Sequence, residues 1–386
     1  MTNFKLALRN LLGAGMKTWL NVIVLSMSFV IIIFYNGMMD GWNRQARNEN
    51  IAWEMGGGQL WHNDYDPYDL FTLNDAHASV PAGMDMSKAV PELIIQAAAY
   101  PQGRMLNILL KGIPADQQVL ELPTAKLKSE GGVSQAIIGK RMAENAKLTE
   151  GDQLLIRWRD KNGTFDAKQI TIAHIFDTDN PAVDQGQIWM DFAELERMTG
   201  LENEATLITL AEGYKAPEDE NFTAKSLGVL MKNIDEIIAS KKGSMGIVYV
   251  MLMGIALLAI FDTQVLSIFR RQKEIGTYIA LGMTRSRVVG LFTIEGGAVS
   301  LLAAAVGALY GIPIFAYLAS NGIDIPTASA EGAGVTMASK IYPVYGFGLV
   351  LGTTLLVVIA ATIVSYMPAR KIARLNPTEA LKGKLQ

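Results

Sequence analysis

The sequence contains no cysteine and only three histidines in 386 residues. Without cysteine, a folded domain has neither disulfides nor thiolate metal ligands and must be stabilised by packing alone. The histidines His62, His77 and His174 are far apart in the sequence and form no H-E-x-x-H pattern, the zinc-binding signature of metalloproteases. The composition therefore disfavours a membrane protease or another metalloenzyme.

The sequence also lacks a phosphate-binding loop. The stretch "GAGMKT" from Gly13 to Thr18 comes nearest, but the pattern G-x-x-x-x-G-K-T needs glycine at the positions of Leu11 and Met16. We therefore expect no nucleotide-binding site and no catalytic residues in this chain. Any ATPase that works with it is expected to be a separate chain.

Long apolar runs are abundant instead. Half of the residues are hydrophobic, 18% are charged and the mean hydropathy is positive, which indicates a protein partly embedded in a membrane. A membrane-spanning helix needs about 20 apolar residues. Buried core helices are the alternative, but four nearly uncharged runs of this length favour four transmembrane helices. The runs are Trp19–Met38, Ser244–Phe269, Val288–Leu318 and Tyr345–Met367.

Lysine and arginine collect beside these runs, and their distribution predicts the orientation of the chain. Residues 1–17 carry three basic residues, and residues 270–287 and 369–386 carry five each, so these segments and both termini are expected in the cytoplasm. Residues 40–242 carry 20 basic and 31 acidic residues, a net charge of −11. This sign disfavours a nucleic-acid partner.

The predicted fold class is an α-helical membrane protein with four transmembrane helices and a mixed α/β extracytoplasmic domain inserted between helices 1 and 2. That outer domain is large enough for a core of its own. The expected order is a cytoplasmic amphipathic helix at 1–17, spans at 18–39, 244–269, 288–318 and 345–367, the outer domain at 40–243, a cytoplasmic segment at 270–287, an outer loop at 319–344 and a cytoplasmic tail at 368–386.

Local patterns in the outer domain mix strands and helices. Alternating apolar residues predict strands at Gln153–Arg159 and Phe165–Phe176, joined by a turn with the hairpin signal Asn162-Gly163. The stretches "GKRMAENAKL" and "DFAELERMTG" predict short helices with polar faces. The stretch from Glu220 to Gly243 is typical of an amphipathic helix, and we expect it to lead into the second span.

Between the second and third spans lies the stretch "RRQKEIGTYIALGMTRSRVVG", Arg270–Gly290. Its apolar residues from Ile275 to Leu281 have helical spacing, Gly282 follows as a helix stop, and Thr284 suits the N-cap of the next helix. So short a loop is not expected to bury this apolar face by itself. Docking of a cytoplasmic protein is favoured over a basic helix resting on anionic lipid headgroups, and catalysis is not expected.

This stretch resembles the coupling segment of the FtsX-like permeases, also called MacB-type or type VII ABC transporter permeases. The resemblance rests on "RRQKEIG" at Arg270–Gly276 and "ALG" at Ala280–Gly282, followed by two further arginines. "LALRNLL" at Leu6–Leu12 and "PARKIARLNPTEALKG" from Pro368 agree with it. A weaker likeness lies in the outer stretches "IIGKRMAENAKLTEGDQLLI" and "FDTDNPAVDQGQIWMDFAELERM".

The resemblance implies a permease paired with a second copy or a related permease, and bound to two cytoplasmic ABC ATPase subunits. ATP and magnesium would bind to those subunits, and this chain would bind no cofactor. ATP binding would move the coupling segment, and the spans would pass the motion to the outer domain. The residues assigned to ATPase coupling are Arg270, Arg271, Lys273, Glu274, Ile275, Gly276, Leu281, Gly282 and Arg285.

Each coupling residue has a physical role in this hypothesis. The cations are expected to donate to carboxylates of the ATPase, Ile275 and Leu281 to be apolar anchors, and Gly276 to permit close backbone approach. Glu274 is expected to pair with a basic residue of the partner or with an arginine of its own chain. Arg270 and its neighbour also satisfy the positive-inside rule without any partner.

Two acidic residues are predicted to lie near the membrane, Asp262 in the second span and Glu295 in the third. Charged groups in a membrane are costly and indicate function by default, and Glu295 matches a position that often carries an acid in similar permeases. Snorkelling to the interface or pairing with an arginine is the structural alternative.

Two glycine pairs have the G-x-x-x-G spacing that lets helices approach closely. They are Gly307 with Gly311 and Gly348 with Gly352. We expect them to support helix packing, without identifying a dimer interface.

Within the family, four spans with an outer domain of about 200 residues most resemble the lipoprotein-releasing permeases of the LolC, LolE and LolF type. This implies extraction of lipoproteins from a bacterial inner membrane and their transfer to a periplasmic carrier. The predicted cleft lies between the first and second spans of facing subunits, although its candidate side chains are equally compatible with facing lipid. These candidates are Met27, Phe29, Phe34 and Tyr35.

Two other functions stay open. One is an efflux permease that works with an adaptor and an outer-membrane channel, and the other is a signalling permease that moves no substrate and controls a cell-wall hydrolase. For the last, "GGGQLWHNDYDPYDLF" supplies Trp61, Tyr65, Tyr68 and Phe71 as anchors for a protein partner. A surface loop packed on its own domain is the alternative.

Overall fold

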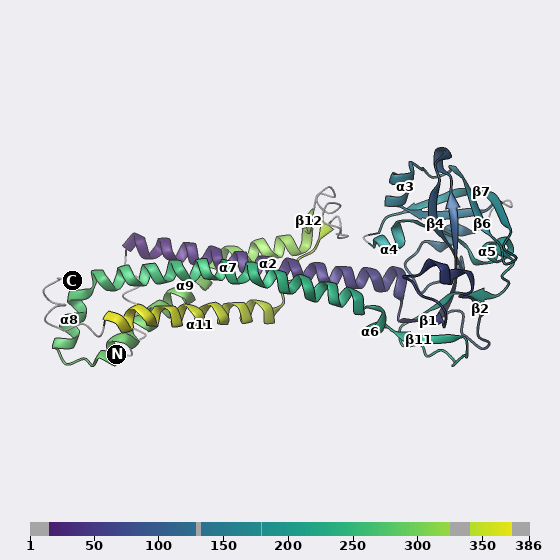
Figure 1. Ribbon diagram of the computed structural model, residues 1–386. Helices are drawn as coiled ribbons and strands as arrows, with labels where there is room; N and C mark the ends of the chain where they lie inside the picture. The colour runs from purple at the N-terminus through teal and green to yellow at the C-terminus, as the bar shows by residue number, and fades with distance from the viewer. Residues whose placement is uncertain (1–14, 129–132, 179, 325–339, 373–386) are drawn as a thin grey trace. The chain divides into compact units, whose positions relative to one another are not determined.

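The computed structural model describes residues 15–128, 133–178, 180–324 and 340–372, which divide into two compact units. The membrane unit comprises the described parts of residues 1–43, 238–324 and 340–386. The mixed unit comprises the described parts of residues 44–237. Figure 1 labels the elements of both units. The N-terminal helix predicted at 1–17 lies almost wholly outside the described residues, as does most of the predicted tail.

The membrane helices agree with the hydropathy pattern. Three segments of the described chain are long and apolar enough to cross a membrane: Val22–Met55, Arg285–Asn321 and Phe347–Arg370. They overlap the first, third and fourth predicted spans, and the first continues past its predicted end at Met38 to Met55. The second predicted span lies in a continuous helix, and its apolar part found among the described residues is Gly246–Ile255. The helices are α2 (Gly15–Asn50), α7 (Lys232–Arg270), α8 (Gln272–Ala280), α9 (Arg285–Asn321) and α11 (Phe347–Ile372).

Small and branched side chains pack α2, α9 and α11 together. A buried cluster joins Phe29 and Ile32 of α2 to Ala303 of α9 and Ala361 of α11. Tyr310 of α9 lies within 3.2 Å of Ser26 on α2, hydroxyl to hydroxyl. A two-stranded ribbon of β12 (Ile323–Asp324) and β13 (Lys340–Ile341) lies between α9 and α11 in the sequence.

The two G-x-x-x-G pairs behave differently. A Cβ at Gly307 would lie 3.3 Å from the carbonyl oxygen of Ser26, and one at Gly311 would lie 3.1 Å from Val30, so this pair permits close contact with α2. A Cβ added at Gly348 or Gly352 would meet no atom within 4 Å among the described residues. The packing prediction is therefore confirmed for the first pair only.

The mixed unit is built on a nine-stranded sheet in which six strands close into a ring. The order around the ring is β3, β4, β8, β5, β7 and β6, and β6 pairs back onto β3. The pairs β4 with β8 and β5 with β7 are parallel, and the others are antiparallel. The strands are β3 (Ala89–Ala99), β4 (Leu106–Ile113), β5 (Gln135–Gly139), β6 (Gln153–Arg159), β7 (Phe165–Phe176) and β8 (Gln187–Asp191).

Three further strands extend the sheet from the first half of β3. They are β10 (Leu207–Leu210), β1 (Gly58–His62) and β11 (Phe222–Ser226), paired in this order. A separate short pair is β2 (Ala78–Ser79) with β9 (Glu204–Ala205). The helices are α3 (Lys140–Ala146), α4 (Pro181–Asp184), α5 (Phe192–Thr199) and α6 (Leu227–Leu230), and single helical turns lie at Ile51–Met55, Leu70–Asn74, Pro101–Gly103 and Thr124–Leu127.

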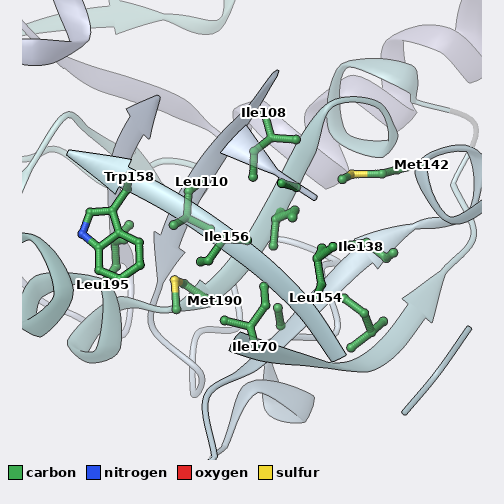
Figure 2. Close-up of a cluster of buried hydrophobic side chains, with 14 of the residues drawn as sticks. Ile108, Leu110, Ile138, Met142, Leu154, Ile156, Trp158, Ile170, Met190 and Leu195 are labelled. Carbon is green, nitrogen blue, oxygen red and sulfur yellow. The ribbon is translucent and has the colours of Figure 1, made fainter. Parts of the chain in front are cut away.

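Successive residues of a strand point to opposite faces of the sheet, so every second residue of the ring strands can face the same core. Figure 2 shows Leu110, Ile138, Ile156 and Met190 converging with neighbouring side chains in one cluster. Trp189, the neighbour of Met190, lies in a second cluster, and each of these five residues is at most 1% exposed. Strand β8 is therefore buried on both sides, whereas β6 alternates between exposed and buried residues. Packing in these clusters replaces the disulfides that the sequence lacks.

Several local predictions for this unit are confirmed. The hairpin strands β6 and β7 have the predicted bounds and pair antiparallel from Gln153 opposite Thr171 to Arg159 opposite Phe165. The two short helices are α3 and α5. The amphipathic helix predicted from Glu220 is wrong at its start, because Phe222–Ser226 forms a strand that pairs with β1. Phe222 is buried there, and a free strand edge of the sheet outweighs local helical spacing.

The two outer stretches that carry the weaker family likeness meet in space. Arg141 at the start of α3 forms a 2.8 Å ion pair with Asp184 at the end of α4, and the backbone N–H of Arg141 donates to the same carboxylate at 3.0 Å. Gly139 leaves room for this contact, because a Cβ there would overlap Asp184. The pair joins segments that are more than 40 residues apart in the chain.

Candidate coupling site

A short helix connects α7 to α9 at one end of the membrane helices (Figure 1). Helix α7 ends at Arg270, α8 covers Gln272–Ala280, and Gly282 has a φ of +92°, which glycine adopts without steric cost. Thr284 occupies the N-cap position of α9, although its side chain makes no capping hydrogen bond. The predicted helix stop and the following helix start are thus confirmed.

One face of α8 is buried inside the chain. Ile275 is 2% exposed and packs with Val288 and Phe292 of α9 and Ala369 of α11. Gly276 beside it is also buried. The loop does not bury Ile275 by itself, as expected, but α9 and α11 of the same chain supply the surface, so a second molecule is not needed to bury this residue. In this structure Ile275 anchors α8 to its own chain.

Arg271 is the polar centre of the same contact. Its Nη1 donates to both carboxylate oxygens of Glu295 at 2.9 Å, and its Nε donates to Glu274 at 2.9 Å. The guanidinium carbon lies 5.1 Å from the ring centre of Phe292, within range of a cation–π contact. The Arg271 side chain is 20% exposed and that of Glu295 is 9% exposed. Its donors are directed at its own chain, where a contact with an ATPase was predicted.

This arrangement decides between the alternatives for the intramembrane acids. Glu295 has the arginine partner that the structural alternative requires, and Glu274 pairs with an arginine of its own chain. Asp262 lies on an exposed side of α7. The structure therefore gives Glu295 a role in fixing α8 to α9, and it shows no such contact for Asp262 among the described residues.

The opposite face of α8 and the adjoining turn are open. Leu281 is 80% exposed, and four cationic side chains at the end of α7, in α8 and at the start of α9 are exposed as well. We call this surface the basic face. Its members are Arg270, Lys273, Leu281, Arg285 and Arg287. An exposed leucine among cations is suited to an acidic protein groove with an apolar pocket.

A cavity of about 430 Å³ lies between α2, α9 and α11. Phe29 lines it, whereas the other three predicted cleft residues do not. Met27 is exposed, and Phe34 and Tyr35 are partly exposed. Sequence reasoning missed the wall that α9 provides, although its alanines at 304, 308 and 316 recur at helical spacing and were a usable signal.

The aromatic loop of the mixed unit divides into a packed and an open part. Trp61 and Tyr65 lie edge to face at 5.2 Å and pack on a small buried cluster, as the packed-loop alternative requires. Tyr68 and Phe71 are 81% and 80% exposed. Only these two are available as anchors for another molecule.

Long apolar helices, a mixed α/β domain between the first and second of them, and a short helix joining α7 to α9 define a multi-pass membrane protein. Residues 246–377 match the family model of the FtsX-like permease C-terminal domain. This part of the chain, about a third of its length, is thus similar to the C-terminal domain of FtsX-like permeases. The family resemblance drawn from Arg270–Gly276 is confirmed at this level.

Curated relatives are permeases of the same class. An uncharacterized ABC transporter permease of Methanocaldococcus jannaschii is 26% identical over 172 residues, 43% of this chain and 39% of that protein. The macrolide export ATP-binding/permease protein MacB of Wolinella succinogenes is 28% identical over 192 residues, 49% of this chain and 26% of that protein. MacB of Neisseria gonorrhoeae is 22% identical over 298 residues, 69% of this chain and 42% of that protein. The chain spans less than half the length of these relatives.

Two solved structures overlap with this chain. The extracellular domain of the noncanonic ABC-type transporter YknZ from Gram-positive bacteria is 15% identical, with a TM-score of 0.26, and the overlap covers 41% of this chain and 83% of that one. The periplasmic region of MacB from Actinobacillus actinomycetemcomitans is 10% identical, with a TM-score of 0.30, and the overlap covers 50% of this chain and 98% of that one.

Proposed function

We propose that this chain is the permease subunit of a mechanotransmitting ABC transporter and that its basic face docks on a cytoplasmic ATPase. The observation that carries the proposal is the exposure of Leu281, which directly follows α8 and is 80% accessible, while Ile275 within α8 is 2% accessible. An exposed leucine in a segment that also carries four exposed cations is suited to an acidic groove with an apolar pocket. The FtsX-like domain in which it lies supports an ATPase as the partner.

The Arg271 contact supports a way of transmitting force. A load applied to the basic face acts on α8, and α8 is fixed to α9 by the Arg271–Glu295 pair and by the packing of Ile275 on Val288. When α8 is displaced, α9 therefore moves with it, and the displacement is not lost by bending of the turn between the two helices. ATP and magnesium would bind to the ATPase, and this chain would transmit the movement from α8 to α9.

The docking surface is tested by charge reversal and by removal of the anchor. Leu281→Ser and Arg285→Glu should each reduce recovery of the ATPase on the purified permease by about tenfold, the loss expected for an interface hot spot. Arg104→Glu, an equally drastic change at an exposed position of the mixed unit, is the charge-matched control. Undiminished recovery with both basic-face variants would remove the docking assignment.

The proposed location is a bacterial inner membrane, with both termini in the cytoplasm and the mixed unit in the periplasm. The basic segments flanking the spans support this orientation. Because the chain has no cysteine, single cysteines report topology directly. An impermeant thiol reagent applied to spheroplasts should label Ser79→Cys and leave Ser286→Cys unlabelled until the cells are lysed; both serines are exposed. The reverse labelling would invert the topology.

For the substrate, we propose acylated lipoproteins, which the permease would extract from the outer leaflet and pass to a periplasmic carrier. The support is the match of span number and outer-domain size to the lipoprotein-releasing permeases. Depletion of the protein should strand outer-membrane lipoproteins in the inner membrane, as measured by membrane fractionation and mass spectrometry. An unchanged distribution would remove lipoproteins as the substrate without affecting the ATPase assignment.

Efflux with an adaptor and an outer-membrane channel is the second candidate. It is favoured by the relatives named as macrolide export proteins and by the exposed Tyr68 and Phe71, which are suited to bind an adaptor. The double variant Tyr68→Ser/Phe71→Ser should then raise sensitivity to exported compounds with normal insertion in the membrane. The same two residues would serve a cell-wall hydrolase in the signalling alternative, and in that case the variant should disturb cell separation instead.

A further inference from the structure

The outer surface of the hairpin β6–β7 carries two arginines. Figure 2 shows Leu154, Ile156 and Trp158 of β6 in the ring core, so the residues that alternate with them point outward. The register of β6 with β7 places the outward residues of both strands on one exposed surface, which we call the arginine strip. Its members are Leu155, Arg157, Arg159, Phe165, Ala167 and Gln169.

The arginine strip is an exception in the charge of its unit. Residues 40–242 have a net charge of −11, but the strip contains two arginines and no acidic residue. The guanidinium carbon of Arg157 lies 4.2 Å from the ring centre of Phe165, and Nε of Arg159 donates to the carbonyl oxygen of Gly163 at 3.0 Å. Neither contact supplies a negative charge. Both arginines are therefore available to pair with carboxylates of another molecule.

A loop of the same unit has the opposite charge. Residues 64–71 contain three aspartates and no basic residue. The backbone N–H of Tyr68 donates to Asp66 at 2.9 Å, and that of Phe71 donates to Asp69 at 3.0 Å, so the loop is fixed by its own side chains. We call this segment the acidic loop. Its exposed charged and aromatic residues are Asp64, Asp66, Tyr68, Asp69 and Phe71.

The acidic loop and the arginine strip lie side by side. The side-chain amide of Gln96 on β3 donates to the carbonyl oxygen of Leu70 in the loop at 2.6 Å. Two residues further along β3, Ala98 lies opposite Arg157 of β6. Residues two apart on a strand share a face and are about 7 Å apart. The loop therefore meets the sheet on the same side as the strip, and we call the two together the divided face.

A face divided in this way is complementary to itself. In a two-fold dimer the same patch of both copies meets, so each contact occurs twice. An axis at the border of the two halves places the acidic loop of each copy on the arginine strip of the other. The halves also match in apolar character, because the exposed Tyr68 and Phe71 would meet Phe165 and Leu155, which are 62% and 41% exposed.

We propose that the mixed units of two copies of this chain contact each other through the divided face, with each acidic loop on the arginine strip of the other copy. A second copy carries both charges in the matching order, which charge complementarity requires. The inference goes beyond the proposed function, since neither ATPase docking nor the substrate enters it. The contact covers Tyr68 and Phe71, so it excludes an adaptor bound to the same two residues.

Cross-linking tests the contact in the purified full-length chain in detergent. Because the chain has no cysteine, two differently tagged copies can be co-expressed, one with Leu70→Cys and one with Ala167→Cys. Mild oxidation or a short bismaleimide should join them at least tenfold more than it joins Leu70→Cys to Asn145→Cys, the control at an exposed position of α3 outside the divided face. A yield no higher than that of the control would overturn the proposal.

Charge variants of these two copies test the pairing itself. Arg157→Glu in both should lower the cross-linking yield at least fivefold, because it places like charges opposite each other. Lys215→Glu, the same reversal at an exposed position outside the divided face, should leave the yield unchanged. Adding Asp64→Arg to Arg157→Glu restores opposite charges and should recover at least half of the lost yield. Equal effects of the two single reversals, or a loss without recovery, would overturn the proposal.

Cross-linking in intact cells distinguishes a second copy from another protein. The cysteine at position 70 should be joined there to the cysteine at position 167 of the second copy. Its capture by a different extracytoplasmic protein, without any link between two copies, would assign the face to that protein and overturn the proposal. ATPase recovery and lipoprotein distribution are not read out, so a failure of the proposed function leaves this result intact.

Discussion

The Nη1 atom of Arg271 lies 2.9 Å from both carboxylate oxygens of Glu295. This pair connects the start of α8 to a residue about three turns into the next membrane helix. Buried pairs of this kind contribute little net stability compared with apolar packing, but loss of one partner is severe because a charge is left unpaired. The pair therefore fixes the position of α8 relative to α9.

Arg271→Gln should destabilise the membrane unit. It leaves the Glu295 carboxylate buried without a cation, at a cost of about 3–5 kcal/mol in the free energy of unfolding. Arg270→Gln removes the same charge from the neighbouring exposed position and should cost less than about 1 kcal/mol. Thermal unfolding of the detergent-solubilised chains measures both.

The double variant Arg271→Gln/Glu295→Gln is the informative control for that prediction. It contains no unpaired charge, so it should recover part of the stability that Arg271→Gln loses. If the single variant at 271 is as stable as the one at 270, the pair does not hold α8 in solution.

Gly139→Ala should destabilise the mixed unit. A Cβ there would overlap the Asp184 carboxylate and backbone, so the ion pair with Arg141 must shift, at a cost of about 1–3 kcal/mol. Gly228→Ala in α6, where a Cβ meets no described atom within 4 Å, should be neutral or slightly stabilising. Tryptophan fluorescence, to which Trp189 and three other tryptophans of this unit contribute, reports its unfolding. Equal stability of both variants would contradict the close contact at Gly139.

The stability of the mixed unit should depend on Glu92. This residue is 2% exposed and accepts a hydrogen bond from Thr209, and burial raises the pKa of its carboxyl above the ordinary value. Because the folded state holds this proton more tightly than the unfolded state, the stabilisation is present at low pH. It is lost as the pH rises from the ordinary pKa of the carboxyl through the raised folded-state pKa.

Glu92→Gln cannot ionise and tests this pH dependence. Its unfolding free energy should fall less between about pH 4.5 and pH 8 than that of the unmodified chain, as measured by denaturant unfolding at several pH values. The nearby Lys111 lowers the pKa of Glu92 and limits the effect, and Lys111→Met should enlarge it in the chain that keeps Glu92. Parallel pH curves for the unmodified chain and the Glu92→Gln variant would contradict the shift.

The two glycine pairs should respond differently to valine. Gly307→Val places a branched side chain against the Ser26 carbonyl on α2 and should separate the helices, at a cost of about 1–3 kcal/mol. A Cβ at Gly352 meets nothing within 4 Å in the described part of the chain, so Gly352→Val should leave the monomer stable. If Gly352→Val instead reduces the oligomeric state in gel filtration, the exposed side of α11 is a contact with a second permease.

Some features of the site were predictable because they depend on neighbours in the sequence. The hairpin of β6 and β7, the helix stop at Gly282 and the helix start after Thr284 follow from alternation and turn chemistry. The strand at Phe222–Ser226 could not be predicted in this way, because its partner β1 lies more than 150 residues earlier in the sequence. The role of Ile275 was missed for the same reason, since the surface that buries it comes from α9 and α11.

The sequence by itself determined the membrane spans, the charged segments between them and the packing-only stability of a chain without cysteine, because these depend on composition and local order. Only the tertiary structure decided the rest. It directs Arg271 toward Glu295, buries Ile275 while Leu281 stays open, closes six strands into a ring, and forms a cavity beside the alanines of α9. Each of these is a contact between distant segments, and its energy exists only once the chain has brought the two partners together.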